Sequence, residues 1–564
     1  MKQGAFTFVL HTHLPYCRQA GRWPHGEEWV HEAASESYIP LLVALDALRV
    51  EGCRFKLTIG MTPILAEQLA DDLVRDHMGE FLEGKVRRAE ADVRRFRQDG
   101  DAHREAIARL YRDHYASVLD SYTQTYHTDI LGGLARLQDD GYLEIATSAA
   151  THGYLPLFSR DSSIAGQVQV GVRAYRRHFG RAPRSFWLPE CAYRPAYHAT
   201  EDDRTYVRPG IESLLAEAGV RCFFCETHVL EGGAPVGKAV GEAVGPYGTI
   251  VRRYVAPPSP ARPRTQATTF QAYWVAEPKV AVIGRNARTG IQVWSATHGY
   301  PGDFWYREFH KRDGVSGLQY WRVTDALKDL GTKDFYAPDR AAEQVRAHSA
   351  HFAGLVEEMV RGYHEGTGKF GIVCAAYDTE LFGHWWFEGV EWLKQALRHL
   401  ARSPSVELTT AGEFIAQRAP QDALTLPEGS WGQGGGHFTW QNADNSWMWP
   451  LIHEVEQRME RLAARFPDAQ GHLREVLDQA AREKLLLESS DWPFLISTGQ
   501  AREYAVLRFR EHRERFQQLA SAAEEDRAHE GAALARRLYE RDKVFPDMDY
   551  RLFRSRKETG GYRA

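Results

Sequence analysis

Two carboxylic acids stand among bulky aromatic side chains in this sequence. Glu190 occurs in SFWLPECAYRP between Trp187 and Tyr193, and Asp378 occurs in FGIVCAAYDTELFGHWW shortly before two tryptophans. An apolar wall keeps one carboxylic acid protonated near neutral pH, whereas a carboxylate that accepts hydrogen bonds stays ionised. One acid and one nucleophilic carboxylate are what cleavage or transfer of a glycosidic bond requires. The pair therefore predicts chemistry on a sugar. Taken singly, either acid would be explained as well by an ion pair with a residue such as Arg194, or by simple solvation.

Three histidines offer a second kind of chemistry. His11 and His13 form the i, i+2 pair of HTH, so both side chains lie on one face of a predicted strand, and His152 follows a later strand. Some metal-dependent hydrolases hold zinc with such a pair, and His384 with Asp378 would complete the ligand set. We expect no metal, because donors to sugar hydroxyls, or buried histidines with protein partners, explain the same residues.

Tryptophans in glycine-rich stretches provide flat surfaces on which sugar rings stack. Trp431 and Trp440 lie nine residues apart in LPEGSWGQGGGHFTWQN, a spacing that does not place both on one face of a helix. We therefore predict two sugar-stacking walls on a flexible loop. Trp294 and Trp305, near Gly and Pro turns, either extend this platform or are ordinary core residues.

These residues need a scaffold that brings distant segments together. Short apolar strands alternate with helices along the chain, which favours a parallel sheet closed towards a barrel. In such a barrel the carboxyl ends of the strands gather at one mouth, where the functional residues lie. We expect strands at residues 4–10, 54–60, 142–149, 185–190, 220–226, 280–284, 292–296 and 370–378, and helices at 35–50, 161–180, 210–219, 339–364 and 388–402.

Three stretches depart from this alternation. Residues 65–128 are charged and helix-periodic, which predicts a helical hairpin inserted into the barrel. Residues 230–270 are rich in Gly and Pro and predict a mobile loop. From about residue 450 the pattern is helical. We therefore expect a catalytic barrel at 1–404 and a C-terminal helical domain at 405–564.

The composition excludes several classes of protein. The chain has 564 residues, of which 43% are hydrophobic and 26% charged, as in globular proteins. Its net charge is −5, whereas nucleic-acid-binding proteins are usually basic, so we expect no nucleic-acid partner. The sequence contains no run of about 18 apolar residues, so we expect no membrane span. Because His11 and His13 interrupt the first apolar run before any signal-peptide pattern, we expect a cytoplasmic protein.

Five segments resemble, in order, the motif regions of glycoside hydrolase family 57, namely HTHLPY, EIATSAATHGYLP, FWLPECAY, YDTELFGHWW and NADNSWMWP. Two others, EGSWGQGGGHFTW and ESSDWPFLISTG, look specific to its 1,4-α-glucan branching enzyme subgroup, and the resemblance extends from residue 1 to about residue 510. It implies an α/β fold, an incomplete seven-stranded (β/α) barrel with an inserted helical hairpin domain. A C-terminal all-helical domain would contribute to the active-site cleft.

The resemblance also assigns roles to individual residues. Glu190 matches the family nucleophile and Asp378 matches the acid/base of a retaining double displacement, which needs neither metal nor cofactor. The positions that match substrate-binding residues are His11, His13 and His152 at the donor sugar, Trp294, Trp431 and Trp440 around the acceptor groove, Asp491 and Trp492 in a segment of the helical domain, and Tyr247 on a loop at 231–249.

The activity implied by the resemblance is that of a 1,4-α-glucan branching enzyme of glycogen metabolism. Such an enzyme cleaves an α-1,4 glucan, for example amylose or glycogen, and re-attaches the chain as an α-1,6 branch. The loop carrying Tyr247 would act as a lid that excludes water and favours transfer. The alternatives are an α-amylase or 4-α-glucanotransferase of the same family, a metal-dependent hydrolase, and a non-catalytic glucan-binding protein. We expect no nucleic-acid or membrane partner, and a monomer or small homo-oligomer.

Overall fold

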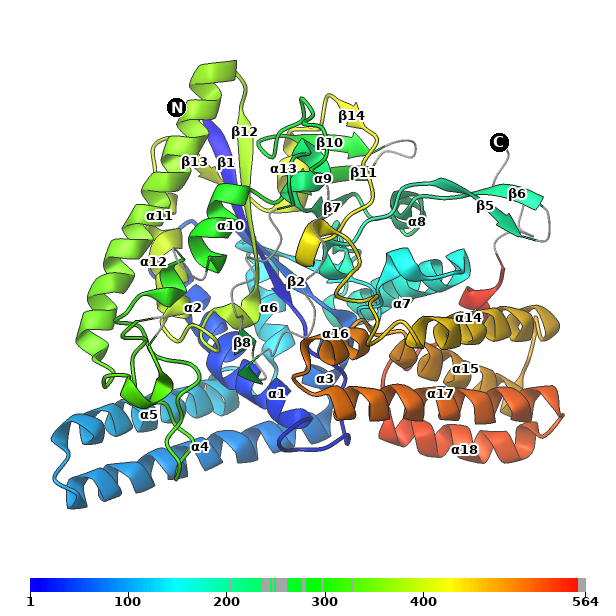
Figure 1. Cartoon of the computed structure of the whole chain (residues 1–564), viewed down its shortest axis with the longest axis horizontal. Coiled ribbons are helices and arrows are strands. Elements are labelled where there is room, and N and C mark those ends of the chain that lie inside the picture. The colour runs from blue at the N-terminus through cyan, green and yellow to red at the C-terminus, as the bar shows by residue number, and fades with distance from the viewer. Residues whose placement is uncertain are drawn as a thin grey trace.

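The computed structural model is built around an open, curled and mostly parallel β-sheet (Figure 1). It describes residues 1–201, 204–235, 244–245, 248–249, 261–275, 280–295, 299–325 and 328–555. Among these residues, seven neighbouring strands run parallel in the order β12-β1-β2-β3-β4-β7-β11, which confirms the expected incomplete barrel. The seven strands are β1 (Gly4–Thr12), β2 (Leu57–Met61), β3 (Leu143–Ser148), β4 (Ser185–Trp187), β7 (Cys222–Cys225), β11 (Val280–Gly284) and β12 (Gly371–Asp378).

Shorter strands extend the edges of this sheet. β10 (Ala272–Val275) runs antiparallel to β11, β14 (Ala423–Leu424) pairs with β10, and β13 (Val406–Leu408) pairs with the start of β1. All nine residues of β1 are buried, as expected for a central strand of a parallel sheet whose two faces are both covered. Among the described residues, two antiparallel strand pairs lie outside the sheet, β5 (Tyr197–Glu201) with β6 (Arg204–Arg208) and β8 (Val244–Gly245) with β9 (Gly248–Thr249).

Helices of the barrel follow most of its strands and pack against the sheet (Figure 1). The longest is α11, whose thirty residues end at Gly368 in the left-handed conformation that favours glycine. These helices are α1 (Glu27–Ala33), α2 (Ile39–Val50), α3 (Pro63–Ala70), α6 (Ile130–Asp139), α7 (Asp161–Phe179), α8 (Ile211–Glu217), α9 (Thr227–Glu231), α10 (Ala287–Trp294), α11 (Pro338–Thr367), α12 (Gly389–Ala401) and α13 (Ala411–Gln417). Short π-helical segments are η1 (Ala34–Tyr38) and η2 (Ser121–Thr125). Short 3-10 turns are η3 (Leu155–Leu157), η4 (Pro189–Cys191), η5 (Tyr300–Gly302), η6 (Leu330–Thr332), η7 (Thr379–Leu381), η8 (Gln433–Gly435) and η9 (Tyr550–Phe553).

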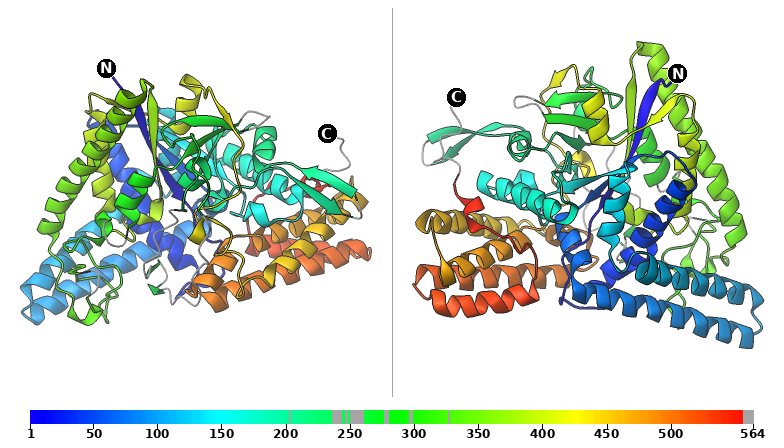
Figure 2. Two further views of the ribbon diagram at one scale, coloured as in Figure 1. Left: turned by 45° about the horizontal axis from the view of Figure 1, so that its top comes forward. Right: turned by 180° about the vertical axis from the view of Figure 1, so that it is seen from behind.

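A long helical hairpin projects from one side of the barrel (Figures 1 and 2). It consists of α4 (Asp72–Gln98) and α5 (Ala102–Asp120). Each helix is capped by an aspartate, because Asp71 accepts from the backbone N–H of Val74 and Asp101 accepts from that of Arg104. The side of α4 that packs inward carries buried residues three or four apart, namely Val74, Met78, Leu82, Lys85, Ala89, Val93 and Phe96.

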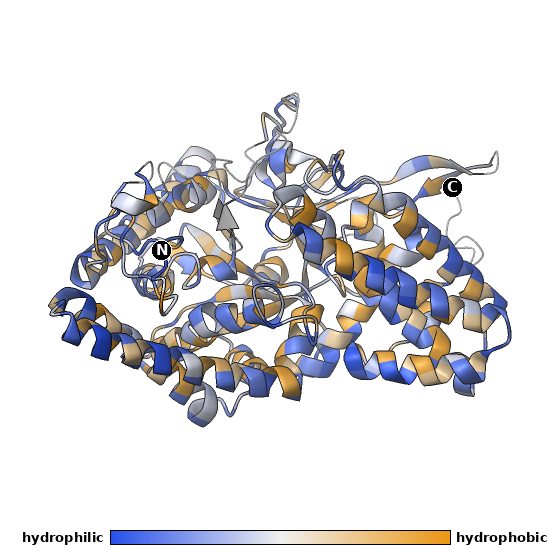
Figure 3. Ribbon diagram, turned by 60° about the horizontal axis from the view of Figure 1, so that its bottom comes forward, coloured by the Kyte–Doolittle hydropathy of each residue, from blue (hydrophilic) through white to orange (hydrophobic). Residues whose placement is uncertain are grey.

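A bundle of helices packs against another side of the barrel (Figure 2). Its members are α14 (Met448–Arg465), α15 (Gly471–Leu487), α16 (Asp491–Thr498), α17 (Arg502–Glu524) and α18 (Ala528–Arg541). Its helices and those of the hairpin carry hydrophilic and hydrophobic residues in bands, as amphipathic helices do (Figure 3). In the described parts of the chain, no helix combines the length and the apolar character that crossing a bilayer requires.

Two local expectations from the sequence are wrong. The strand expected at 185–190 ends at Trp187, and the following residues form the tight turn η4. Residues 292–296 were expected to form a strand, but Gln292, Val293 and Trp294 end the helix α10. Asn286 caps this helix by accepting from the backbone N–H of Thr289, and that cap overrides the β-favouring residues of the segment.

Candidate active site

Asp378 lies at the carboxyl end of β12, directly beside the end of β1. In the parallel register of these two strands, Asp378 is the partner of His11. The Asp378 residue is only 8% exposed. One residue further on, the hydroxyls of Thr12 and Thr379 lie 2.7 Å apart and tie the two strand ends together. The acid expected from the sequence thus sits at the mouth of the barrel, next to a histidine of the expected donor-sugar site.

Glu190 lies in the turn η4, two residues after Leu188. Its backbone is left-handed, with φ of 61°, and Cys191 follows with φ of 49°. Left-handed backbone costs energy in residues other than glycine, and it concentrates at functional sites. Two backbone hydrogen bonds close the turn, from the Cys191 N–H to Leu188 and from the Ala192 N–H to Pro189. The turn therefore fixes the direction in which the Glu190 side chain projects from the backbone.

The side chain of Glu190 is held by Trp431. The indole Nε1 donates to Glu190 Oε2 at 2.6 Å, and the backbone N–H of Trp431 donates to the Glu190 carbonyl at 3.0 Å. Tyr193 and Gly429 exchange a further pair of backbone hydrogen bonds, so the two segments lie side by side like strands. The sequence predicted Trp431 to be a sugar-stacking wall. The structure places it, 2% exposed, as the hydrogen-bond donor to the candidate nucleophile.

Trp187 connects the two acidic segments. Its ring stacks on that of His11 with centroids 4.7 Å apart, and it meets Trp431 edge-on at 5.0 Å. His11 is in turn the register partner of Asp378. The segments that carry Glu190 and Asp378 therefore share one neighbour, His11, and lie at the same mouth.

The three predicted histidines form a compact cluster. His11 and His152 share a hydrogen bond between their Nε2 atoms at 3.0 Å, and the ring of His13 stacks on that of His152 with centroids 3.8 Å apart. The Nδ1 atom of His152 lies 4.0 Å from Glu190 Oε1. His384, by contrast, bonds Glu36 at 2.7 Å. In the part of the chain that the structure describes, the set considered for zinc does not come close enough to share one ion.

The start of α16 reaches this cluster from the helical bundle. Asp491 accepts from His13 Nε2 at 3.0 Å, and the Ser490 hydroxyl lies 2.9 Å from His152 Nδ1. Burial lowers the pKa of His13, but Asp491, followed by the charges of Glu190 and Glu380, outweighs it and leaves the pKa raised. Trp492, also expected at the cleft, instead points into the bundle, fully buried and bonded to the Leu486 carbonyl.

Glu380 is a buried acid to which the sequence analysis gave no role. It accepts from the Tyr38 hydroxyl at 2.5 Å and from the His13 backbone N–H at 3.2 Å. Burial, and then the charge of Asp378, raises the pKa of Glu380 to about 7. The signal in the sequence was its position two residues after Asp378 in YDTELFG, which places both acids at one strand end.

The remaining predicted aromatic residues occupy different places. Trp440 is 1% exposed and stacks on Tyr154 with centroids 4.4 Å apart, so protein covers its ring. Trp294, at the end of α10, is partly buried and lies 6.0 Å from Trp385, ring centre to ring centre. Tyr247 lies outside the described residues.

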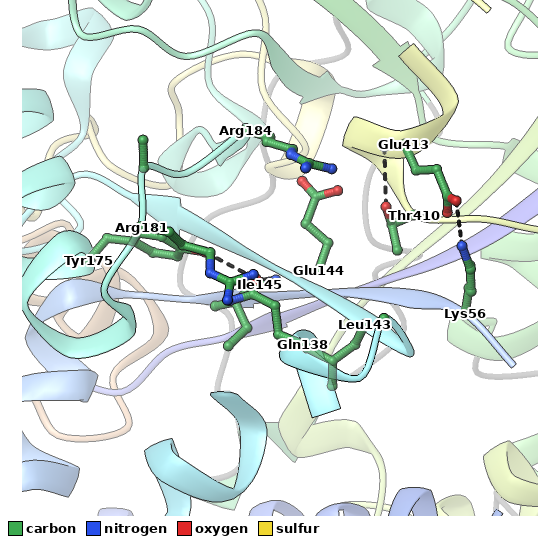
Figure 4. Close-up of a pocket in the computed structure, with 12 residues that line it drawn as sticks. Lys56, Gln138, Leu143, Glu144, Ile145, Tyr175, Arg181, Arg184, Thr410 and Glu413 are labelled. Carbon is green, nitrogen blue, oxygen red and sulfur yellow. Dashed lines mark hydrogen bonds and ion pairs between the residues drawn. The ribbon is translucent and has the colours of Figure 1, made fainter. Parts of the chain in front are cut away.

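A polar cavity of about 220 Å³ lies at the opposite end of the barrel, where its strands begin (Figure 4). Lys56 and Arg184 precede β2 and β4, and Glu144 lies near the start of β3. Lys56 forms an ion pair with Glu413, and Glu144 accepts from the Gly412 backbone N–H at 2.7 Å. These contacts join the strand starts to α13, which fits a structural role.

A buried cluster in the helical bundle resembles a metal site by residue type alone. Glu483, His512 and Asp542 lie close enough to share an ion. However, His512 already bonds Glu483 at 2.8 Å, and Arg515 pairs with Asp542 at 2.5 Å. With Arg508 also 3.8 Å from Asp542, the cluster already holds its own positive charge and is an ion-pair network.

Comparison with known proteins identifies the family. The family model described as glycosyl hydrolase family 57 matches residues 7–427. The chain belongs to glycosyl hydrolase family 57. A second model, for the C-terminal part of 1,4-alpha-glucan branching enzymes, matches residues 451–553. The similarity to branching enzymes thus covers the helical bundle.

The similar proteins match nearly the whole chain. A 1,4-alpha-glucan branching enzyme of Thermococcus kodakarensis is 46% identical over 92% of this chain and 74% of its own. Its crystal structure superposes with a TM-score of 0.88, covering 98% of this chain and 97% of that one at 43% identity. The branching enzyme of Pyrococcus horikoshii gives 0.86 at 41% identity, with 98% and 97% covered. The α-amylase AmyC of Thermotoga maritima gives 0.80 at 29%, with 98% and 99% covered.

Proposed function

We propose that this chain is a 1,4-α-glucan branching enzyme in which Glu190 is the nucleophile and Asp378 the acid/base of a retaining double displacement. The observation that carries this assignment is the position of His11. It is the register partner of Asp378 and stacks on Trp187, three residues before Glu190, so both acids face one mouth. The similarity to branching enzymes over both the barrel and the helical bundle supports the same activity.

The first displacement cleaves the donor glucan. The Glu190 carboxylate, oriented by the indole of Trp431, attacks C1 of an α-1,4-linked glucose. As the bond between C1 and O4 breaks, Asp378 gives its proton to the leaving O4. The donor chain is then held on Glu190 as a glycosyl ester with inverted configuration.

The second displacement forms the branch. Asp378, now ionised, takes the proton from the 6-hydroxyl of an acceptor glucan, and that oxygen attacks C1. The ester bond to Glu190 breaks, the carboxylate is regenerated, and the second inversion restores the α-configuration. The products are an α-1,6 branch on the acceptor and a shortened donor.

Hydrolysis is the competing outcome, because water can take the sugar from the same ester. The similarity to a protein named as an α-amylase makes this the second candidate. The two outcomes differ only in which hydroxyl reaches C1, so exclusion of water decides between them. The expected substrates are α-1,4-glucans such as amylose or glycogen, and the cytoplasmic location remains a prediction.

Incubation with amylose tests the proposal. We expect new α-1,6 linkages, measured by enzymatic debranching and by NMR, to exceed new reducing ends. Glu190→Gln should lower the activity more than about a thousandfold while the thermal transition stays near that of the wild type. Glu454→Gln changes an exposed glutamate on α14 and serves as the control. Reducing ends without α-1,6 linkages would make the enzyme an amylase, and full activity of Glu190→Gln would reject the nucleophile.

A further inference from the structure

The start of α16 completes the hydrogen bonds of the histidine cluster from a different part of the chain. Asp491 Oδ1 lies 3.0 Å from His13 Nε2, and its other oxygen accepts from the Ser489 hydroxyl at 2.5 Å. Asp491 is 9% exposed. Both oxygens of Asp491 are therefore engaged within the protein. Its geometry fits a group that acts on His13 better than one that holds a sugar hydroxyl, the role expected from the sequence.

His13 is also fully engaged. Its Nε2 atom faces Asp491, and its Nδ1 atom lies 3.1 Å from the Thr62 hydroxyl. A carboxylate accepts only from a protonated nitrogen, so Nε2 carries a hydrogen, and the hydroxyl of Thr62 can accept from a second one on Nδ1. The ring is thus placed to exist as an imidazolium without losing either contact.

The two neighbouring histidines favour a single cation in the cluster. His11 and His152 share one hydrogen bond between their Nε2 atoms, so only one of these atoms carries a hydrogen. At least one ring of that pair is therefore neutral. His13 stacks on His152 at 3.8 Å, where a second cation would repel the first.

The acidic groups that face His13 come from three other segments. They are Asp491 of α16, Glu190 of η4 and Glu380 of η7. Of these, Asp491 makes the direct contact with the ring, whereas Glu380 reaches the His13 backbone N–H. Together they raise the pKa of His13 against the effect of burial, with Asp491 contributing most.

We propose that Asp491 is a positioning residue through which the helical bundle holds His13 as an imidazolium, stacked on His152, whose Nδ1 atom lies 4.0 Å from Glu190. The proposal rests on the proposed role of Glu190 as the nucleophile. A positive charge in this place favours the ionised form of Glu190, which is the form that attacks C1. The bundle would then supply part of the electrostatics of the barrel's active site, in addition to its packing.

Titration of the His13 ring tests the proposal without any turnover. Histidine ring signals are followed by NMR from pH 5 to 9, and His13→Gln identifies the signal of His13. In the wild type, His13 should titrate above the ordinary histidine value. Asp491→Asn should lower the midpoint by about one pH unit or more. Asp547→Asn, which removes an exposed carboxylate paired with Arg177 on the barrel, should leave the midpoint unchanged.

The pH dependence of kcat/KM gives the second readout. In Asp491→Asn the acidic limb should move up by about one pH unit, so kcat/KM should fall by up to about tenfold at pH values below the limb and should stay unchanged well above it. Asp491→Glu should restore the limb. An equal loss at every pH, or an unmoved His13 midpoint, would show that Asp491 only supports the fold. If asparagine is not tolerated, Asp491→Ser gives the same comparison. A chain without glucan activity would reject the proposed function, while the NMR titration still decides the role of Asp491.

Discussion

At the scale of single residues, the two acids at the mouth differ in how they are held. Glu190 is fixed by an indole N–H, in a strained turn, whereas Asp378 ends a regular strand beside a second acid, Glu380. A fixed carboxylate suits a nucleophile, because its ionised oxygen must point at the carbon that it attacks. An acid/base must gain and lose a proton in each cycle, and its neighbours set how readily it does so.

Asp378→Asn should separate the two displacements. The amide cannot protonate the leaving oxygen, so activity on amylose should fall at least about a hundredfold. A maltosyl fluoride needs no such proton, because fluoride leaves unassisted, and the variant should still form the glycosyl ester from it. The measurement is release of fluoride against release of chains from amylose. Glu190→Gln should lose both reactions, and equal losses for Asp378→Asn on the two substrates would contradict its role.

Glu380 predicts a pH dependence of stability with a definite sign. Its pKa of about 7 in the folded protein exceeds the ordinary 4.5, so folding favours the neutral acid. The stabilisation is complete below pH 4.5 and is lost as the pH rises through 7, by about 3 kcal/mol at about 1.4 kcal/mol per pH unit. Glu380→Gln is neutral at every pH, so this variant should keep the stabilisation at high pH.

The measurement is the melting temperature of wild type and variant from pH 5 to 8.5. The variant should gain on the wild type progressively above pH 5, and its amide oxygen can still accept from Tyr38 and His13. Glu391→Gln, on the exposed side of α12, should show no such trend. A difference in melting temperature that does not change with pH would contradict the account of Glu380.

At the scale of elements, the hairpin α4–α5 is joined to the barrel through a buried lysine. Lys85 of α4 lies 3.7 Å from Glu36 of η1 and over the ring of Tyr115 of α5. Burial raises the pKa of Glu36, but Lys85 and then His384 outweigh it and leave that pKa well below its ordinary value. The charge on the hairpin thus stabilises an ionised acid inside the barrel.

Lys85→Met should destabilise the protein by about 3–5 kcal/mol, because Glu36 stays buried with less positive charge beside it. Methionine keeps most of the volume and the contact with Tyr115, so the loss reports the charge. The midpoint of urea unfolding measures it. Arg87→Ala removes an exposed pair with Glu83 on the same helix and should cost less than about 1 kcal/mol. Equal effects of the two substitutions would show that the buried pair carries no special weight.

At the scale of the whole molecule, barrel and bundle are joined by buried polar contacts. Glu456 of α14, fully buried, accepts from the Ser159 backbone N–H at 3.0 Å and hydroxyl at 2.8 Å, and from the Arg160 N–H at 3.3 Å. Arg160 is the residue before α7, so the carboxylate sits where the helix dipole is positive. The division into domains at 1–404, 65–128 and 405–564 stays a prediction.

Glu456→Ala should lower the stability by about 3 kcal/mol, because the partly buried N–H groups of Ser159 and Arg160, just before α7, lose their acceptor. The loss should appear in the melting temperature, and activity at low temperature should persist, since the site itself is untouched. Glu454→Ala, two residues away but exposed, is the matched control. If the two variants melt alike, the contact does not hold the bundle on the barrel.

The sequence by itself determined the family, the barrel and the two candidate acids. These follow from local patterns, because a strand, its buried residues and the polar group at its end are adjacent in the chain. Local patterns of this sort predicted the parallel strands, the hairpin helices and the position of Asp378 at a strand end. The misassigned strand at 292–296 shows the limit of local patterns, since a single cap at Asn286 turned β-favouring residues into helix.

Only the tertiary structure decided which groups each functional side chain meets. Trp431 looked like an exposed platform, yet it donates to an acid 241 residues away. Asp491 looked like a substrate ligand, yet it faces His13, 478 residues away in the chain. Such contacts have no local signature, because hydrogen bonds between distant segments depend on how the barrel and the bundle pack. The residue types are written in the sequence, whereas their partners, and hence their charge, are set by the fold.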